Sequence, residues 1–169
     1  MTQTRSERSR TYSWTDPAEH AAMMGSRSGL DLLRAMASGE LPAPPVMHLI
    51  DMAGLEVEEG SVTVHLDPQE FHYNPLGTVH GGVLSTLLDT AAACSVHTTL
   101  PAGVGYTSLD LTVKFLRPVT VASGRITTRG AVLQRGRRTA LAEARMTDAA
   151  GRLVAHATSS CLIFDASGT

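Results

Sequence analysis

The stretch from Asn74 to Asp89 carries the residues best suited to chemistry. A turn, His80-Gly81-Gly82, opens an apolar segment with helical spacing, and one carboxylate, Asp89, stands inside that segment. An ionised carboxylate is costly to bury unless it is paired or used, so its position indicates a functional role. The helix N-terminus adds unpaired backbone N–H groups and a positive dipole end. Together these features supply the two halves of an acyl-transfer site: donors for an oxyanion, and a base or nucleophile.

The spacing of this motif has a consequence for the assembly. His80 and Asp89 are nine residues apart, which on one helix is about 2.5 turns and roughly 13 Å, on nearly opposite faces. The two side chains therefore do not meet through this helix within one chain. If they share a site, Asp89 most simply comes from a second copy, and a twofold dimer then builds two equivalent composite sites.

Length and composition fit one soluble globular domain. The chain has 169 residues, of which 43% are hydrophobic and 18% are charged, enough for a real core. The formal net charge of -2 gives no global nucleic-acid signature. No apolar run reaches the roughly 18 residues of a membrane span, and the N-terminus has no apolar signal-peptide core. We therefore expect a cytoplasmic protein without nucleic-acid or membrane partners, and we interpret Cys94 and Cys161 as reduced core residues.

Hydrophobic periodicity predicts the secondary structure. One long helix runs from Gly82 to about Thr98, and a shorter one from Ser28 to Ala37. The pattern at 47–52 fits either a short helix or a strand, and 68–77 is expected to be loop. Alternation predicts strands at 61–67, 109–115, 121–134, 140–146 and 153–163. We divide the chain into a mobile tail (1–25), a helix with a proline-rich connection (26–44) and one domain (45–169).

The order of these elements predicts an α+β fold. One strand, the long helix and then four strands joined mostly by short turns favour a curved antiparallel sheet wrapped around a central helix. The inward positions of the last two strands are rich in alanine. Such small side chains allow the sheet to curl closely onto the helix.

This pattern resembles the hot-dog fold, and more narrowly the PaaI-like acyl-CoA thioesterases of the phenylacetate-pathway type. The resemblance covers about residues 45–164 and includes Asn74, Gly77, the His-Gly-Gly turn and Asp89. It extends to S-L-D-L-T-V-K-F-L-R-P over 108–118, R-G-R-R-T-A over 135–140 and G-R-L-V-A-H-A-T over 151–158. The spacing from Asn74 through the turn to Asp89 is its most specific part.

The resemblance implies a homodimer, assembled as a dimer of dimers, that hydrolyses acyl-CoA without metal or cofactor. The N–H of Gly81 would polarise the thioester carbonyl. Asp89 of the partner subunit would activate water or attack as a nucleophile, and Ser108 would orient that water. Asn74 and His80 would hold the loop and would themselves lie near the departing sulfur.

Substrate binding is expected from Gly82 and from four arginines. Arginine binds phosphate well, so a basic patch could cradle the coenzyme A phosphates. The alternative for these arginines is a solvated rim. The four are Arg117, Arg135, Arg137 and Arg138.

Ser108 conflicts with simple strand alternation. In a regular strand it would lie on the same face as Asp110, opposite the apolar face that begins at Leu109. A serine that reaches the helix from that face needs a bulge, or a strand that begins after Ser108.

Other chemistries lack their motifs. The seven histidines include no His-Glu-x-x-His pair and no zinc spacing, and there is no Gly-x-Ser-x-Gly elbow or P-loop. Two alternatives remain: a hot-dog hydratase or dehydratase, and a non-catalytic acyl-CoA-binding or regulatory module. The acyl group and the choice between coenzyme A and a carrier protein stay open. Candidates for an acyl pocket are Tyr106, Leu100, Met47 and Leu49.

Overall fold

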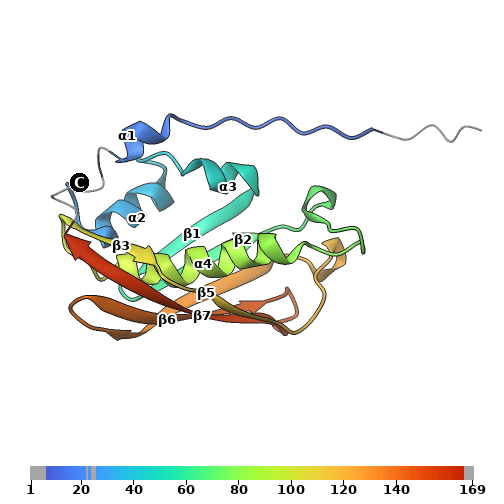
Figure 1. Cartoon of the computed structure of the whole chain (residues 1–169). Coiled ribbons are helices and arrows are strands. Elements are labelled where there is room, and N and C mark those ends of the chain that lie inside the picture. Colours follow the sequence, from blue (N-terminus) through green and yellow to red (C-terminus); the bar gives the residue numbers. More distant parts are fainter. Residues whose placement is uncertain (1–6, 22, 24–25, 166–169) are drawn as a thin grey trace, which may run out of the picture.

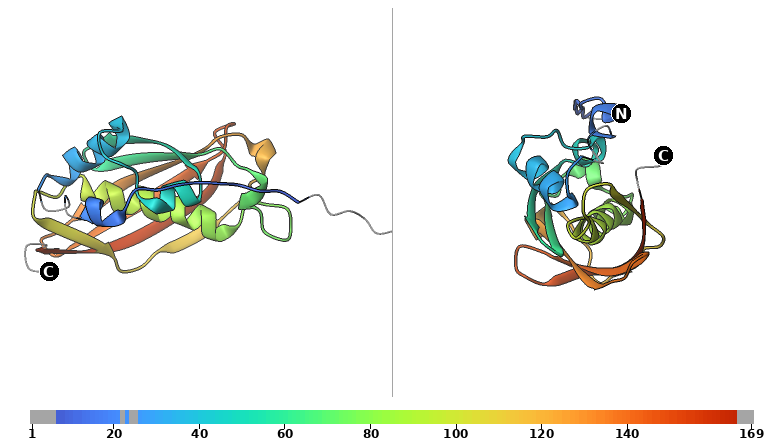
Figure 2. Two further views of the ribbon diagram at one scale, coloured as in Figure 1. Left: turned by 90° about the horizontal axis from the view of Figure 1, so that it is seen from above. Right: turned by 90° about the vertical axis from the view of Figure 1, so that its left-hand side faces the viewer.

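The structure, a computed structural model, describes residues 7–21, 23 and 26–165. A seven-stranded sheet curves around the long helix α4 (Gly81–His97), as Figure 1 shows from the side. The right-hand view of Figure 2 looks along α4, and the sheet forms an arc around it. This arrangement confirms the predicted α+β hot-dog architecture.

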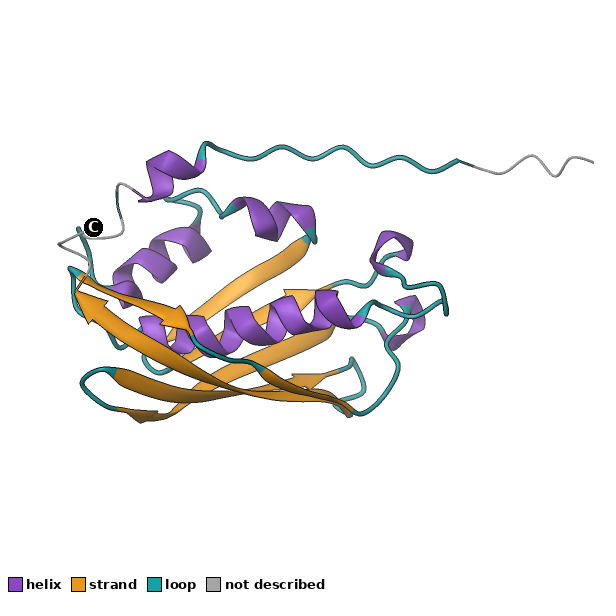
Figure 3. Ribbon diagram, in the orientation of Figure 1, coloured by secondary structure: helices purple, strands orange, loops and turns teal. Residues whose placement is uncertain are grey.

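The strands lie in the order β1, β2, β5, β6, β7 and β3, and β4 pairs with β7 as well. The paired strands are antiparallel. Figure 3 separates the strands from the helices by colour. The strands are β1 (Met52–Glu58), β2 (Ser61–Leu66), β3 (Val104–Ser108), β4 (Thr112–Phe115), β5 (Ile126–Arg135), β6 (Thr139–Thr147) and β7 (Leu153–Asp165). The shorter helices are α1 (Pro17–Ala21), α2 (Gly29–Ser38), α3 (Pro45–Leu49) and the 3-10 turns η1 (Glu70–His72) and η2 (Val121–Ser123).

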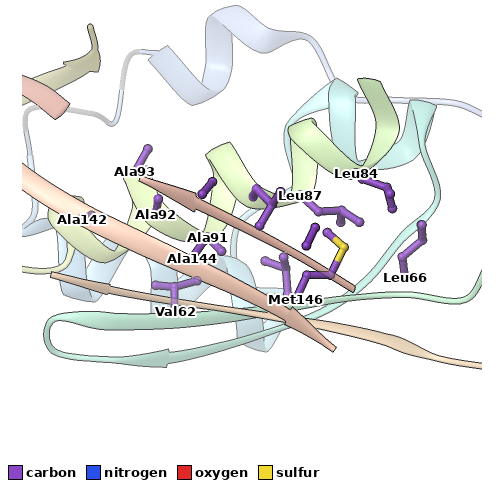
Figure 4. Packing of buried hydrophobic residues seen from close by; sticks show 14 of the residues in the cluster. Val62, Leu66, Leu84, Leu87, Ala91, Ala92, Ala93, Ala142, Ala144 and Met146 are labelled. Carbon is purple, nitrogen blue, oxygen red and sulfur yellow. The ribbon is translucent and has the colours of Figure 1, made fainter. Parts of the chain in front are cut away.

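The core lies between α4 and the concave face of the sheet. Leu87, Leu88 and Ala91 of α4 are fully buried. Ala142 and Ala144 of β6 face them and have no exposed surface either, so the predicted alanine-rich inner face is confirmed. Figure 4 shows this packing, with Val62, Leu66, Leu84, Ala92, Ala93 and Met146 also labelled.

A glycine sets how closely α4 approaches the sheet. A Cβ atom on Gly130 of β5 would lie 2.1 Å from the carbonyl oxygen of Ala91 and 2.6 Å from Oγ of Ser95. Ser95 in turn accepts a hydrogen bond at 3.0 Å from the N–H of Val62 on β2. The helix backbone therefore rests on β5 at a position where only glycine fits.

We expect Gly130→Ala to destabilise the fold by ~3 kcal/mol or more, because the added methyl group forces the helix backbone off the sheet. The melting temperature should then fall by about 10 °C, because each kcal/mol of lost stability lowers it by a few degrees in a chain of this length. Gly136→Ala is the matched control, since its Cβ would lie 3.2 Å from the nearest atom, in an exposed turn. Equal melting temperatures for the two variants would refute the close contact.

The strand predicted at 109–115 is wrong as a single element, because β3 ends at Ser108 and β4 begins at Thr112. Ser108 pairs with Cys161, and Thr112 pairs with Thr158. The segment from 108 to 112 is therefore one residue longer than the segment of β7 that it faces, from 158 to 161. One extra residue is a bulge, and it reverses which side chains face the helix. Leu109, predicted to be buried, is consequently 58% exposed.

The bulge is held by hydrogen bonds from β7. The buried Ser159 donates its hydroxyl to the carbonyl oxygen of Asp110 at 2.8 Å. The Asp110 carboxylate accepts from the N–H of Ser160 at 3.1 Å. These bonds hold the bulge, which changes the face of the sheet on which alternate residues lie. Ser108 therefore points at α4, although in a regular strand it would share a face with Asp110.

Three other segments differ from the sequence prediction. Residues 52–58 form the edge strand β1, and the undecided segment before it holds the end of α3 and a turn. The strand predicted from 121 begins only at Ile126, because 121–123 form η2. The loop predicted at 68–77 contains η1. Phe115, expected on a buried face, is 53% exposed.

The N-terminal helices pack on α4 and β1. The start of α2 fits closely, because a Cβ on Gly29 would lie 2.0 Å from the carbonyl oxygen of His97, and the Gly29 N–H donates to Leu100 at 3.0 Å. Arg10 crosses the end of α3 and donates to the carbonyl oxygens of His48 and Leu49, at 2.7 Å each. The first contact anchors α2 to α4, whereas Arg10 lies in the extended segment before α1, so its bonds tie that segment to the end of α3.

Candidate functional site

Asp89 and Ser108 meet within one chain. The Ser108 hydroxyl donates a hydrogen bond to Oδ1 of Asp89 at 3.0 Å. Both residues are half-buried, Asp89 in the middle of α4 and Ser108 at the end of β3. The bond leaves further lone pairs on the carboxylate to bind a water molecule. An open hollow of about 400 Å³ adjoins both residues.

The start of α4 presents an unused backbone donor. His80 is the N-cap, and its Nδ1 accepts from the Gly82 N–H at 2.8 Å. The His80 carbonyl oxygen accepts from the N–H groups of Val83 and Leu84. Within residues 7–21, 23 and 26–165, no group accepts from the Gly81 N–H. That N–H, at the positive end of the helix dipole, is suited to bind a developing oxyanion.

Asn74 orders the loop in front of this helix. Its Oδ1 accepts from the N–H groups of Leu76 at 2.9 Å and Thr78 at 3.3 Å, and its Nδ2 donates to the Thr78 hydroxyl at 3.0 Å. These contacts hold the turn and occupy the side chain. The geometry therefore gives Asn74 a loop-ordering position, and His80 a capping one.

A buried histidine supports the same loop. His72 accepts the Gln69 N–H on Nδ1 at 2.9 Å, and its Nε2 lies 2.8 Å from the Ile50 carbonyl oxygen, which assigns the proton to Nε2. Its own carbonyl oxygen accepts from the His80 N–H. Burial lowers the pKa of His72, which favours this neutral form. The sequence pattern did not predict this role, because only its burial in the folded chain distinguishes this histidine from the others.

The predicted site residues fall into two groups along α4. Asp89 and Ser108 form one group, while Gly81, His80 and Asn74 form the other at the helix start. Gly81 and Asp89 are eight residues apart, or about 12 Å along the axis. One chain therefore does not bring the oxyanion donor and the carboxylate to the same carbonyl group.

The four arginines do not form one patch within the chain. Arg137 and Arg138 line a shallow hollow of about 530 Å³ with Gly103 and Phe164, near the C-terminal end of α4. Arg135 is exposed at the end of β5. Arg117 follows β4 and donates to the carbonyl oxygen of Leu153 at 2.7 Å.

A cavity of about 230 Å³ runs beside Asp89 under the N-terminal helices. Of the candidates for an acyl pocket, Tyr106 and Met47 line this cavity. Leu100 is buried in the core and Leu49 is 51% exposed. Other lining residues that the sequence reasoning missed are Leu33, Met36, Pro44, Val46, Leu55, Thr90, Ala93, Cys94 and His97.

Neither a metal centre nor a membrane helix emerges from the described part of the chain. There, no three side chains among His, Cys, Asp and Glu cluster to hold a metal ion. None of its helices is both long and apolar enough to span a bilayer. The cysteines are free, and burial raises the pKa of the Cys94 thiol to about 11.

Comparison with known proteins identifies the family. The family model of the thioesterase superfamily matches residues 76–155. A phenylacetic acid degradation-related protein of Ralstonia eutropha JMP134 has 30% sequence identity and a TM-score of 0.69, and the match covers 77% of this chain and 98% of that one. The chain belongs to the thioesterase superfamily. This thioesterase is a thioester hydrolase, and its resemblance to the PaaI-like group is confirmed.

Two further proteins are similar to this thioesterase. Acyl-coenzyme A thioesterase 13 of Homo sapiens is 29% identical over 97 residues, which are 57% of this chain and 68% of that protein. The E. coli PaaI protein from the phenylacetic acid degradation operon is 22% identical, with a TM-score of 0.69 over 81% of this chain and 95% of its own. The second likeness shows the shared fold.

Proposed function

We propose that this thioesterase hydrolyses acyl-CoA in a site shared by two copies of the chain. The observation that carries the proposal is the split described above: an unused Gly81 N–H at the helix start, and an Asp89–Ser108 pair about 12 Å further along. A second α4 lying antiparallel beside the first would place each Asp89 near the other chain's Gly81. Two equivalent sites result.

The reaction follows from these groups. The thioester carbonyl oxygen accepts a hydrogen bond from the Gly81 N–H, which stabilises negative charge as the carbonyl carbon becomes tetrahedral. Asp89 of the partner subunit takes a proton from a water molecule that Ser108 orients, and the water oxygen bonds to that carbon. The carbon–sulfur bond then breaks, the thiolate takes up the proton, and free acid and thiol leave. Direct attack by Asp89 is the alternative, in which water hydrolyses an anhydride.

Coenzyme A is the proposed thiol carrier. The exposed guanidinium groups of Arg137 and Arg138 at the rim of one hollow suit phosphate groups, which arginine binds in a bidentate manner. Arg117, Arg135 and the Gly82 backbone complete the proposed substrate contacts. Asn74 and His80 act by holding the loop and the helix start in place.

Thiol release from a panel of acyl-CoAs tests the function directly. The purified chain should release coenzyme A with burst-free, multiple-turnover kinetics from at least one acyl-CoA. The same panel presented on an acyl carrier protein should turn over at least ~10-fold more slowly. Tight acyl-CoA binding without turnover would instead favour the non-catalytic binding module.

A further inference from the structure

The 230 Å³ cavity begins at the proposed catalytic carboxylate and follows one face of α4. Asp89, Ala93 and His97 are spaced by four residues, so they lie in a row on the helix surface. The row is about 12 Å long. A group attached to the carbonyl carbon next to Asp89 can therefore extend along the helix into this cavity.

The outer wall of the cavity comes from the N-terminal part of the chain. Leu33 and Met36 of α2, and Met47 of α3, line it together with β1. These residues precede the segment 76–155 that matches the superfamily. The contact of Gly29 with His97 fixes α2 against α4, and α3 packs on β1. The wall is therefore an anchored part of the fold.

The chemistry of the lining defines what fits inside. Its members are mostly apolar, and none of those in the described chain is lysine or arginine. The carboxylate of Asp89 stands at one end, so an acyl group that ends in a carboxylate would meet a like charge there and no permanently charged lysine or arginine. The cavity accordingly selects neutral acyl groups.

The part of the cavity lined by Cys94 and His97 offers a hydrogen-bond donor, Tyr106. The Tyr106 ring packs on the His97 ring with centroids 4.9 Å apart, and its hydroxyl lies 4.0 Å from Sγ of Cys94. A thiol at that distance is a weak partner, whereas buried tyrosine hydroxyls usually have a strong one. Burial raises the pKa of Tyr106 well above its usual value, so the phenol stays protonated and can donate.

We propose that this cavity binds the acyl group, that α2 and α3 limit the length of that group, and that Tyr106 donates a hydrogen bond to an oxygen atom on it. The inference rests on the proposed function. An apolar cavity of about 150 Å³ holds benzene, so about 230 Å³ accommodates roughly nine carbon atoms. The substrate class is a neutral acyl-CoA of that size.

Filling the cavity should shorten the preferred chain. In Ala93→Phe, a ring occupies the space beside Asp89, and kcat/KM for octanoyl-CoA should fall at least ~30-fold relative to kcat/KM for acetyl-CoA, by loss of buried apolar contact. Ala37→Phe is the matched control, because Ala37 lies on the exposed face of α2. The control should keep the native ratio within about twofold.

Enlarging the cavity should act in the opposite direction. Met36→Ala removes part of the wall, so the acyl chain length with the highest kcat/KM should rise by two or more carbons, as the new space would otherwise be an empty cavity.

The polar groups of the cavity give two further expectations. Tyr106→Phe should lower the preference for 6-hydroxyhexanoyl-CoA over hexanoyl-CoA about fivefold, the value of one hydrogen bond. Native glutaryl-CoA turnover should be at least ~10-fold slower than hexanoyl-CoA turnover.

Binding to inactive protein separates this inference from the proposed function. Calorimetry with Asp89→Asn should show octanoyl-CoA bound more tightly than acetyl-CoA, and Ala93→Phe added to it should abolish the difference. An unchanged difference, or chain-length profiles that move in neither variant, would overturn the acyl pocket. A separate outcome is that Ala93→Phe abolishes this difference in affinity while the native protein hydrolyses no acyl-CoA. In that case the proposed function fails and the acyl pocket stands.

Discussion

Asp89→Asn should lower kcat for the best acyl-CoA by at least ~100-fold, because the amide neither takes a proton nor attacks a carbonyl. Asparagine keeps the size of the side chain and an oxygen that accepts the hydrogen bond from Ser108. The melting temperature should therefore stay within a few degrees of the native value. Steady-state thiol release, measured with the acyl-CoA that the native chain prefers, gives the result.

Two further variants define the meaning of that loss. Glu59→Gln makes the same carboxylate-to-amide change in the exposed turn between β1 and β2, and it should leave kcat unchanged. Ser108→Ala keeps the carboxylate but removes the hydroxyl that orients water, so a smaller loss of about 10-fold is expected. Native-like kcat in Asp89→Asn would contradict the mechanism outright.

Gly81→Pro should lower kcat by ~10²–10³-fold, the usual cost of removing one oxyanion donor. Proline deletes the backbone N–H and is well tolerated at the first position of a helix. The preceding residue, His80, already has φ −61° and ψ 136°, a conformation that proline favours in its predecessor. The helix should therefore form normally while the donor is lost.

Gly81→Ala is the control for the bulk that proline adds. Its Cβ would lie 3.1 Å from the tip of the Phe115 ring, an exposed side chain that can move aside. Because alanine retains the N–H, kcat should drop less than about 10-fold. Equal losses in Gly81→Pro and Gly81→Ala would show that crowding, and not the N–H, accounts for the effect.

The sequence predicted those features that depend on local pattern. The apolar spacing in α4 and the alternation in β6 and β7 predicted the buried faces correctly, and α2 and α4 begin within one residue of the predicted starts. The edge strand β1 was missed because a bulge between Ala53 and Leu55 breaks its alternation. That register becomes visible only beside β2.

The site was predictable in its residues but not in its geometry. Spacing singled out Asp89 and Gly81, yet the contact between Asp89 and Ser108 depends on the bulge held by Ser159. Such a bulge is set by pairing with β7, about fifty residues away in the chain. The acyl cavity was only partly predicted, since α2 and α3 reach it through tertiary packing that carries no periodic signal.

The central claim is that one active site uses Gly81 from one chain and Asp89 from another. Two differently tagged chains, one carrying Asp89→Asn and the other Gly81→Pro, can be co-expressed and purified through both tags. In that mixed dimer, one site combines an intact Gly81 with an intact Asp89, and the other lacks both.

Thiol release by the doubly purified mixed dimer is the most direct measurement. We expect about half of the native activity per dimer, from one intact site of two, although each variant alone is nearly inactive. Activity no higher than that of the two single variants would contradict the shared site, as would failure to recover any mixed dimer.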